Sequence, residues 1–338
     1  MPPRLTAKDF DQELLNLFDA YVHGNLDRRG FLRGAQQFAT AGVTAVGLLA
    51  ALSPDFAAGQ QVPKDDARLK TEYINYPSLD GTSTVRAYLA RPASAGVSRL
   101  PTVLVIHENR GLNPHIEDIT RRLALDGFMA FAPDALTSLG GYPNNEEKAA
   151  AMFATLDRNK VPDDFVAAAL WLKTRPDGNG KVGAVGFCLG GTIVHLLSIR
   201  VPDLAAGVAF YGTPPDPSNA AKVKAPLLIQ QADIDERNNA ALPAYEAALK
   251  AAGVKFTAYR YPGTQHGGIL DPIGPADYLH RAYPPGAGYP ASWQRPGRLR
   301  RLAWCRHGPA PPIQQRRGRA GPVGRIQQPG RRLHPPRG

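Results

Sequence analysis

Short apolar runs alternate along this chain with longer segments whose apolar residues recur at helical spacing. The short runs predict buried strands, and the helical spacing predicts the helices that connect them. Strands are expected near residues 71–77, 83–90, 102–106, 128–132, 181–187, 205–211, 225–230 and 255–261. Helices are expected near residues 115–126, 145–157, 162–174 and 242–252. Strands that alternate with helices indicate an α/β protein with a mainly parallel, doubly wound sheet flanked by helices.

The strand expected at 83–90 has a different pattern from the later strands. Val85, Ala87 and Leu89 alternate with other residues, which is typical of a strand that buries one face. Because such half-buried strands are common in antiparallel pairs, we expect the first two strands to form an antiparallel edge of the sheet.

Composition divides the chain into three regions. Residues 59–267 carry the pattern of strands and helices, and about 200 residues is an ordinary size for a single α/β domain. Residues 1–58 precede this expected catalytic domain, and residues 268–338 form a tail rich in Arg, Pro and Gly. The formal net charge is +11, and thirteen of the 40 Lys and Arg residues are arginines from Arg281 onward. The other 27 are slightly outnumbered by the 29 acidic residues, so the positive charge belongs to the tail.

The tail has two possible origins. Shifted reading frames of GC-rich genes over-produce Arg, Pro, Gly and Ala, so we interpret the tail as a frame-shifted translation. Resequencing of the codons for residues 262–300 tests this hypothesis, and an intact frame would contradict it. The alternative is a genuine basic, disordered extension that binds anionic partners. Nucleic acid is not expected as a partner, because Trp304 stands nearly alone and stacking on bases needs interleaved aromatic residues.

A candidate nucleophile lies in the sequence Gly186-Phe187-Cys188-Leu189-Gly190, between a predicted strand and a helix-like stretch. The pattern is that of the G-x-S-x-G nucleophile elbow with cysteine in place of serine. Glycines are needed there because a side chain would crowd a turn whose apex residue is strained. The following helix N-terminus would favour a thiolate and an oxyanion. The alternative is a structural cysteine in a Gly-rich turn.

Partners for Cys188 follow it in the chain order of α/β-hydrolases, which is nucleophile, acid and histidine. Asp233 and Asp235 come after the strand at 225–230, and His266 comes just past the strand at 255–261. We expect His266 to take the thiol proton and Asp235 to fix the His266 tautomer. Taken singly, such an Asp is usually a solvated loop residue or a helix cap, and such a His is usually exposed.

The loop after the strand at 102–106 contains Glu108, Asn109 and Arg110. In this fold the corresponding loop supplies an N–H group of the oxyanion hole. A carboxylate and a guanidinium in such a loop are costly unless they are used or paired. The alternative to a catalytic role is a structural ion pair of Glu108 with Arg110 or with a neighbour.

Residues 5 to 267 resemble the dienelactone hydrolase family, which are carboxymethylenebutenolidase-like α/β-hydrolases, and in particular its exported branch. The segments that carry the resemblance are VLVIHENRGLNPHIEDITRRLALDGFMAFAPDALTSLGGYP, KVGAVGFCLGGT and APLLIQQADIDERNNAALPAYEAALKAAGVKFTAYRYPGTQHG. The resemblance implies that Cys188 is the nucleophile, that Asp235 rather than Asp233 is the acid, and that His266 is the base.

The resemblance has three further implications. It implies that Glu108 contacts the cysteine in the resting enzyme and receives the thiol proton when substrate binds. It places the oxyanion hole at the backbone N–H groups of Leu189 and of the loop at Glu108–Asn109. It also implies hydrolysis of a small ester or lactone through an acyl-enzyme. Arg110 is a candidate for binding a substrate carboxylate, because its planar fork suits that group.

No metal or organic cofactor is expected. Cys188 and Cys305 do not form a metal-ligand spacing with the histidines, and His107, His115 and His195 are expected to be structural. The alternative to a hydrolase is a non-catalytic α/β-hydrolase scaffold that is disabled by its altered C-terminus and whose basic tail binds anionic partners.

The N-terminal region resembles a twin-arginine export signal at Asp27-Arg28-Arg29-Gly30-Phe31-Leu32-Arg33. The apolar stretch at 38–52 is shorter than the roughly 20 residues of a membrane-spanning helix. We therefore expect recognition by the twin-arginine export machinery, cleavage near Ala57-Ala58, a periplasmic mature protein and no stable membrane span. The alternative is an N-terminal helical hairpin that stays attached, because residues 9–22 have the pattern of a helix.

Overall fold

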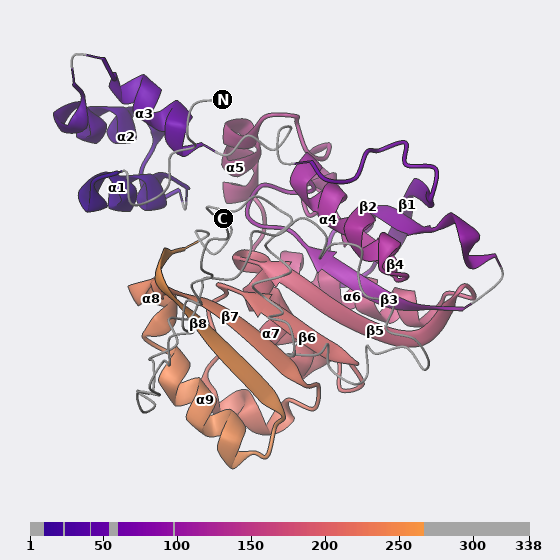
Figure 1. The fold of residues 1–338 in the computed structure, drawn as a ribbon. Helices are drawn as coiled ribbons and strands as arrows, with labels where there is room; N and C mark the ends of the chain where they lie inside the picture. Colours follow the sequence, from indigo (N-terminus) through magenta and orange to yellow (C-terminus); the bar gives the residue numbers. More distant parts are fainter. Residues whose placement is uncertain (1–9, 23, 41, 54–59, 97–98, 267–338) are drawn as a thin grey trace, which may run out of the picture. The chain divides into compact units, whose positions relative to one another are not determined.

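The computed structural model describes residues 10–22, 24–40, 42–53, 60–96 and 99–266. The predicted tail at 268–338 and the predicted cleavage position lie outside these ranges. Within them the chain forms one eight-stranded sheet with helices on both faces (Figure 1).

The strand order of the sheet is β1-β2-β4-β3-β5-β6-β7-β8. The bounds are β1 Leu69–Ser78, β2 Ser83–Pro92, β3 Leu100–Ile106, β4 Met129–Pro133, β5 Gly178–Phe187, β6 Ala206–Phe210, β7 Leu227–Ile234 and β8 Phe256–Gln265. β2 is antiparallel to both β1 and β4, and the remaining pairs are parallel. The predicted mainly parallel sheet with antiparallel early strands is therefore confirmed.

Apart from the short helix at Glu236–Asn239, which was not predicted, the helices of the catalytic domain occur where the sequence predicts them. Their bounds are α4 Pro114–Leu125, α5 Glu146–Ala154, α6 Lys160–Thr174, α7 Leu189–Arg200, α8 Glu236–Asn239 and α9 Leu242–Ala251. Short 3-10 helices are η3 Ala93–Ala95, η4 Thr137–Leu139 and η5 Pro217–Lys222. The first turn of α4 illustrates the local signals: Asn113 caps it by accepting the N–H of Ile116, and Pro114 occupies the first helical position.

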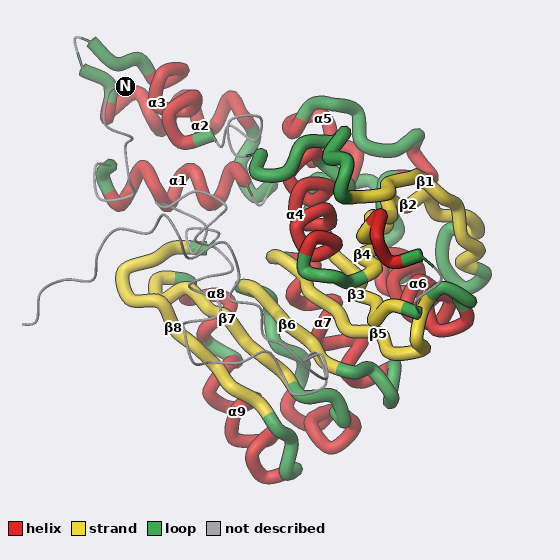
Figure 2. Tube along the Cα trace, turned by 45° about the vertical axis from the view of Figure 1, so that its right-hand side comes forward, coloured by secondary structure: helices red, strands yellow, loops and turns green. Residues whose placement is uncertain are grey.

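Alternate residues of the strands face opposite layers, which places an apolar core on each side of the sheet. Leu104 and Phe131 pack with α6 and α7 on one side. Val105 and Phe210 pack with α4 on the other side. α9 continues the α6–α7 layer over β7 and β8, where Leu242 joins a third cluster. Figure 2 shows these helices against the strands. Because the central strands are buried on both faces, their sequences are continuously apolar.

Segment 60–62, at the start of the catalytic domain, is tied to α4 by a buried ion network. The carboxylate of Asp118 accepts the backbone N–H groups of Gln61 and Val62, and Arg121 Nε donates to the Val62 carbonyl at 2.8 Å. Asp118 also forms an ion pair with Arg122. Breaking a buried charge pair is costly, so these contacts fix the segment firmly.

The N-terminal region contains α1 Gln12–Val22, α2 Arg28–Ala35, η2 Gln36–Phe38 and α3 Ala45–Leu52. α1 corresponds to the helix predicted at 9–22. The side chain of Asp27 accepts the Gly30 N–H and caps α2, and Phe31 is fully buried in an apolar cluster with Leu14 and Leu48. Within the described parts of the chain, no helix is long and apolar enough to cross a membrane.

Candidate active site

Cys188 lies at the apex of a sharp turn between β5 and α7. Its φ is +54°, a left-handed value that is strained for a residue other than glycine. A Cβ atom on Gly186 would lie 2.1 Å from the Gly190 carbonyl oxygen, and one on Gly190 would lie 2.3 Å from the Ile106 carbonyl oxygen. Both glycines are therefore required by close backbone approach, as the elbow pattern predicts.

The structure brings Cys188, His266 and Asp235 together at the carboxyl ends of their strands. The distance from His266 Nε2 to Cys188 Sγ is 3.2 Å, and that from His266 Nδ1 to Asp235 Oδ2 is 2.6 Å. With Nδ1 donating its proton to the carboxylate, the Nε2 lone pair faces the thiol. This is the arrangement of nucleophile, base and orienting acid that acyl transfer requires.

Burial and hydrogen bonding act in opposite directions on Asp235, which is 6 % exposed. Desolvation raises the pKa of its carboxyl group, but hydrogen bonds and charge from His266, together with hydrogen bonds from Asn238, outweigh burial and leave the pKa below its usual value. Asp235 therefore stays ionised at neutral pH, as an orienting acid must.

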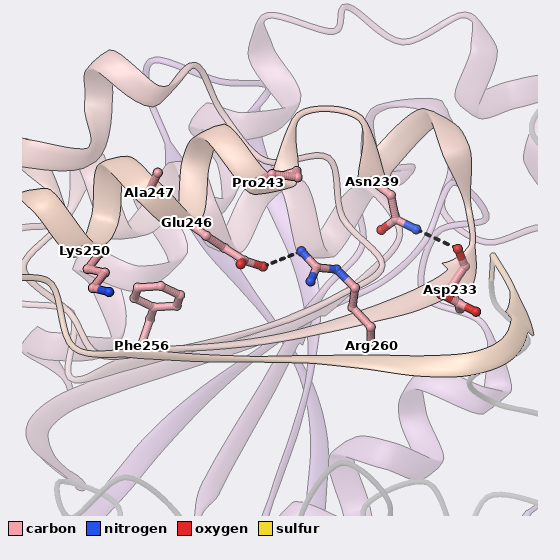
Figure 3. Close-up of a pocket in the computed structure, with 8 residues that line it drawn as sticks. All are labelled: Asp233, Asn239, Pro243, Glu246, Ala247, Lys250, Phe256 and Arg260. Atoms are coloured by element: carbon pink, nitrogen blue, oxygen red, sulfur yellow. Dashed lines mark hydrogen bonds and ion pairs between the residues drawn. The ribbon is translucent and has the colours of Figure 1, made fainter.

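The alternative acid, Asp233, lines a separate pocket of about 580 Å³ beside α9. In this pocket Arg260 forms an ion pair with Glu246 at 2.8 Å, and Asn239 Nδ2 donates to the main-chain oxygen of Asp233 (Figure 3). None of Cys188, His266 and Asp235 lines this pocket. The geometry therefore favours Asp235 over Asp233 as the partner of His266.

Glu108 follows β3 and lies beside the elbow, because Ile106 of β3 pairs with Gly186 of β5. Its Oε1 atom accepts a hydrogen bond from the Tyr211 hydroxyl at 2.9 Å. The contact of Glu108 with the thiol, which the family resemblance implies, stays a prediction.

The expected oxyanion donors occupy suitable backbone positions. Leu189 is the first residue of α7, and the first N–H groups of a helix have no acceptor within the helix. Asn109 belongs to the loop that follows β3, whose end packs directly against Gly190. The roles of the Leu189 and Asn109 N–H groups in binding an oxyanion stay predictions.

Arg110 is engaged with protein groups in the structure. Its Nη1 donates to Asn109 Oδ1 at 2.5 Å, its Nη2 donates to the Val22 carbonyl at 3.0 Å, and its Nε lies 3.6 Å from Glu146 Oε2. The expected alternative was a structural ion pair of Glu108 with Arg110 or a neighbour, and in the structure Arg110 lies against Glu146 instead. Desolvation raises the pKa of Glu146, and the Tyr142 hydroxyl and Arg110 partly offset this effect.

Two residues near the triad were missed by the sequence analysis. Tyr211 follows β6 directly, has a φ of +38°, and its ring centroid lies 5.0 Å from that of His266. Asn238 is 1 % exposed, and its Nδ2 atom lies 2.7 Å from Asp235 Oδ2. The available signal was position: Tyr211 ends the strand next to the nucleophile strand, where ligands and catalytic groups gather in such sheets.

The expected structural histidines His107 and His195 are fully buried. The His107 ring accepts the Ala135 N–H at 3.1 Å, and the His195 ring packs edge-on against Tyr245 with ring centroids 5.3 Å apart. Among the residues that the structure describes, no group of His, Cys, Asp and Glu side chains is arranged to hold a metal ion.

A family comparison decides the class of this protein, because a model of the dienelactone hydrolase family matches residues 85–277. The chain belongs to the dienelactone hydrolase family. It is therefore a hydrolase with the α/β-hydrolase fold, and the family implies a small-molecule substrate. The match ends inside the predicted tail. A second family model, described as YqhI-like, matches residues 1–41.

Curated relatives and solved structures agree with this class. The chain is 31% identical over 237 residues to a Methylorubrum extorquens protein named "Putative carboxymethylenebutenolidase", covering 66% of this chain and 80% of that one. An Escherichia coli protein, "Putative hydrolase fragment YghX", is 49% identical over 106 residues, covering 31% of this chain and 90% of that one. The crystal structure titled "Putative Dienelactone Hydrolase" from Klebsiella pneumoniae has a TM-score of 0.51 at 27% identity, covering 61% of this chain and 91% of that one.

Proposed function

We propose that this protein hydrolyses small carboxylic esters or lactones through a Cys188–His266–Asp235 triad and an acyl-enzyme intermediate. The observation that carries the proposal is the continuous line of contacts from Cys188 Sγ to His266 Nε2 and from His266 Nδ1 to Asp235 Oδ2, at 3.2 Å and 2.6 Å. The names of the curated relatives favour the same substrate class.

In the acylation step His266 Nε2 takes the thiol proton and Cys188 Sγ attacks the acyl carbon. The carbonyl electron pair moves to oxygen, and the resulting oxyanion accepts hydrogen bonds from the Leu189 and Asn109 N–H groups. Removal of one such donor typically costs about 2.7–4 kcal/mol of transition-state stabilisation. The C–O bond then breaks, and the His266 imidazolium gives its proton to the leaving oxygen.

Deacylation uses the same groups in the second half of the cycle. Water attacks the thioester carbon while His266 Nε2 takes a proton from that water. The oxyanion again accepts hydrogen bonds from the backbone N–H groups. Collapse of this intermediate releases the carboxylic acid and the Cys188 thiolate, which regains the proton from His266. Asp235 stays ionised throughout and stabilises the imidazolium each time it forms.

Glu108 is proposed to act at the start of the cycle. Its carboxylate is held by the Tyr211 hydroxyl beside the elbow. From that position it would accept the Cys188 proton first when substrate binds and pass it to His266 Nε2, so that the thiolate forms only in the loaded site and the proton that the leaving oxygen needs still ends on His266. Arg110 is proposed to orient a substrate carboxylate after release from its present partners.

Hydrolysis of activated aryl esters and small enol-lactones by the full chain and its Cys188→Ala variant tests the proposal. We expect turnover by the wild type and none above background by the variant, with circular dichroism confirming that both are folded. Equal rates in the two proteins would place the activity elsewhere. No turnover by a folded wild type would overturn the proposal and favour a non-catalytic scaffold.

We further propose that the protein reaches the periplasm through the twin-arginine machinery. The supporting observations are the Asp27–Arg33 sequence and the apolar helix α3 that follows it. Fractionation of cells expressing the chain with Arg28 and Arg29 replaced by Lys is the test. Periplasmic wild type and retained variant are expected. Cytoplasmic wild type of full mass would indicate that the N-terminal helices stay attached.

A further inference from the structure

Asn238 is part of a closed circuit of contacts that begins and ends at the nucleophile. From Cys188 the circuit passes through His266 to Asp235, and Asn238 Nδ2 lies 2.7 Å from the Asp235 carboxylate. The Asn238 amide oxygen accepts the Thr213 hydroxyl at 2.6 Å.

The other half of the circuit returns to α7. The Thr213 backbone N–H donates to Thr192 Oγ1 at 2.9 Å, and the Thr192 N–H donates to the Cys188 carbonyl at 3.1 Å. The circuit thus joins the helix that carries the nucleophile to the loop that carries the acid.

The orientation of the Asn238 amide follows from its acceptors. The Asp235 carboxylate and the Tyr211 carbonyl lie 2.7 Å and 3.3 Å from Nδ2, and both groups only accept hydrogen bonds. A flipped amide would set its oxygen against both of them. The amide nitrogen therefore faces these acceptors, and the Thr213 hydroxyl donates to the amide oxygen.

The Asp235 carboxylate that Asn238 holds fixes the tautomer of His266. An amide NH₂ has two hydrogens, which the Asp235 carboxylate and the Tyr211 carbonyl accept. Asn238 Nδ2 also lies 3.0 Å from His266 Nδ1. Because the ionised Asp235 carboxylate only accepts hydrogen bonds, His266 Nδ1 carries a proton toward it at 2.6 Å, which leaves Nε2 free to accept from the Cys188 thiol. The neutral tautomer with the proton on Nε2 is useless for deprotonating the thiol.

We propose that Asn238 is a positioning residue of the active site: it holds the Asp235 carboxylate where that group keeps His266 in the productive tautomer, and the Thr213 hydroxyl supports Asn238. This inference rests on the proposed function and names a further residue on which that function depends. Asn238 is 1 % exposed and acts through Asp235, so its effect falls on turnover and not on substrate binding.

The experiment measures how Asn238→Ala changes kcat and KM when it is introduced into the wild type and into the Asp235→Ala variant. A hydrogen bond to a charged group typically supports a rate effect of about 10- to 100-fold, so we expect kcat to fall by that factor with KM nearly unchanged. In the Asp235→Ala background the same change should alter kcat by less than about twofold, because the group through which Asn238 acts is gone. An equal loss in both backgrounds, or no loss in either, would overturn the inference.

Thr213 supplies a matched pair that avoids a cavity at Asn238. Thr213→Val keeps the shape and removes the hydroxyl, whereas Thr213→Ser keeps the hydroxyl. We expect kcat to fall about 3- to 10-fold in the Val variant, which loses one neutral hydrogen bond, and to be retained in the Ser variant. If Asn238→Ala does not fold, this pair decides: equal kcat values for Val and Ser would refute the inference.

The rate of Cys188 alkylation by iodoacetamide near neutral pH separates this inference from the proposed function. If the wild type hydrolyses no ester, the proposed function fails, yet the thiol is still measurable. Slower alkylation in Asn238→Ala than in wild type would support the positioning role, provided that adding Asn238→Ala to the Asp235→Ala variant causes no further slowing. Equal alkylation rates in wild type and Asn238→Ala would contradict it.

Discussion

His195 makes the stability of the nucleophile helix dependent on pH. It lies on α7, is fully buried, and neither ring nitrogen has a hydrogen-bond partner among the described residues. Burial lowers its pKa from 6.5 to about 4. The folded protein therefore keeps His195 neutral at pH values at which the unfolded chain is already protonated.

Proton linkage gives the sign and size of the change in the free energy of unfolding with pH. A folded pKa below the unfolded one gives stability that is complete above the unfolded value of 6.5 and is lost as pH falls toward 4. Each unit is worth about 1.4 kcal/mol, so the free energy of unfolding should lose about 2 to 3 kcal/mol between about pH 7.5 and about pH 4.5 through this residue.

Urea denaturation of wild type and His195→Leu at the two pH values measures how much His195 contributes to the loss of unfolding free energy. Other groups titrate equally in both proteins, so the difference between their pH dependences isolates His195. We expect the wild type to lose about 2 to 3 kcal/mol more than the variant on acidification. Equal losses would refute the reasoning and would show that His195 is protonated in the fold or hydrated there.

Three further predictions concern the site. Gly190→Ala should lower kcat/KM at least about 100-fold in an ester assay, because its Cβ would lie 2.3 Å from a main-chain oxygen of β3. Gly42→Ala is the control and should leave kcat/KM unchanged, because its Cβ would have nothing within 4 Å. Tyr211→Phe removes the hydrogen bond to Glu108 and should lower kcat/KM by about 10-fold; an unchanged value would exclude that bond from turnover. Arg110→Ala should raise KM about 10-fold for esters that carry a free carboxylate and leave neutral esters unaffected, and an equal effect on both would contradict carboxylate binding.

Much of the fold was predictable because its signals are local. The buried strands are short apolar runs, and α4 has both a capping Asn and an N-terminal Pro. The antiparallel strand β2 shows in the alternation around Val85 and Leu89. The elbow is also local, because Gly186 and Gly190 are required within one turn.

The partners of the charged and polar side chains were less predictable. Arg110 was considered with Glu108, two residues away, but it pairs with Glu146, which reaches it from the start of α5. Tyr211 meets Glu108 across 103 residues of sequence. No periodicity encodes such contacts, because they depend on which strand ends lie side by side.

The sequence by itself determined the alternation of strands and helices, the strained elbow at Cys188 and the order of the acid and the histidine after it. These properties depend on backbone sterics and on hydrophobic spacing, which act between neighbours in the chain. Only the tertiary structure decided that Asn238 meets Thr213, that Tyr211 holds Glu108, and that Asp233 faces another pocket. The physical reason is that parallel pairing aligns the carboxyl ends of β3, β5, β6, β7 and β8, so groups far apart in sequence become neighbours there.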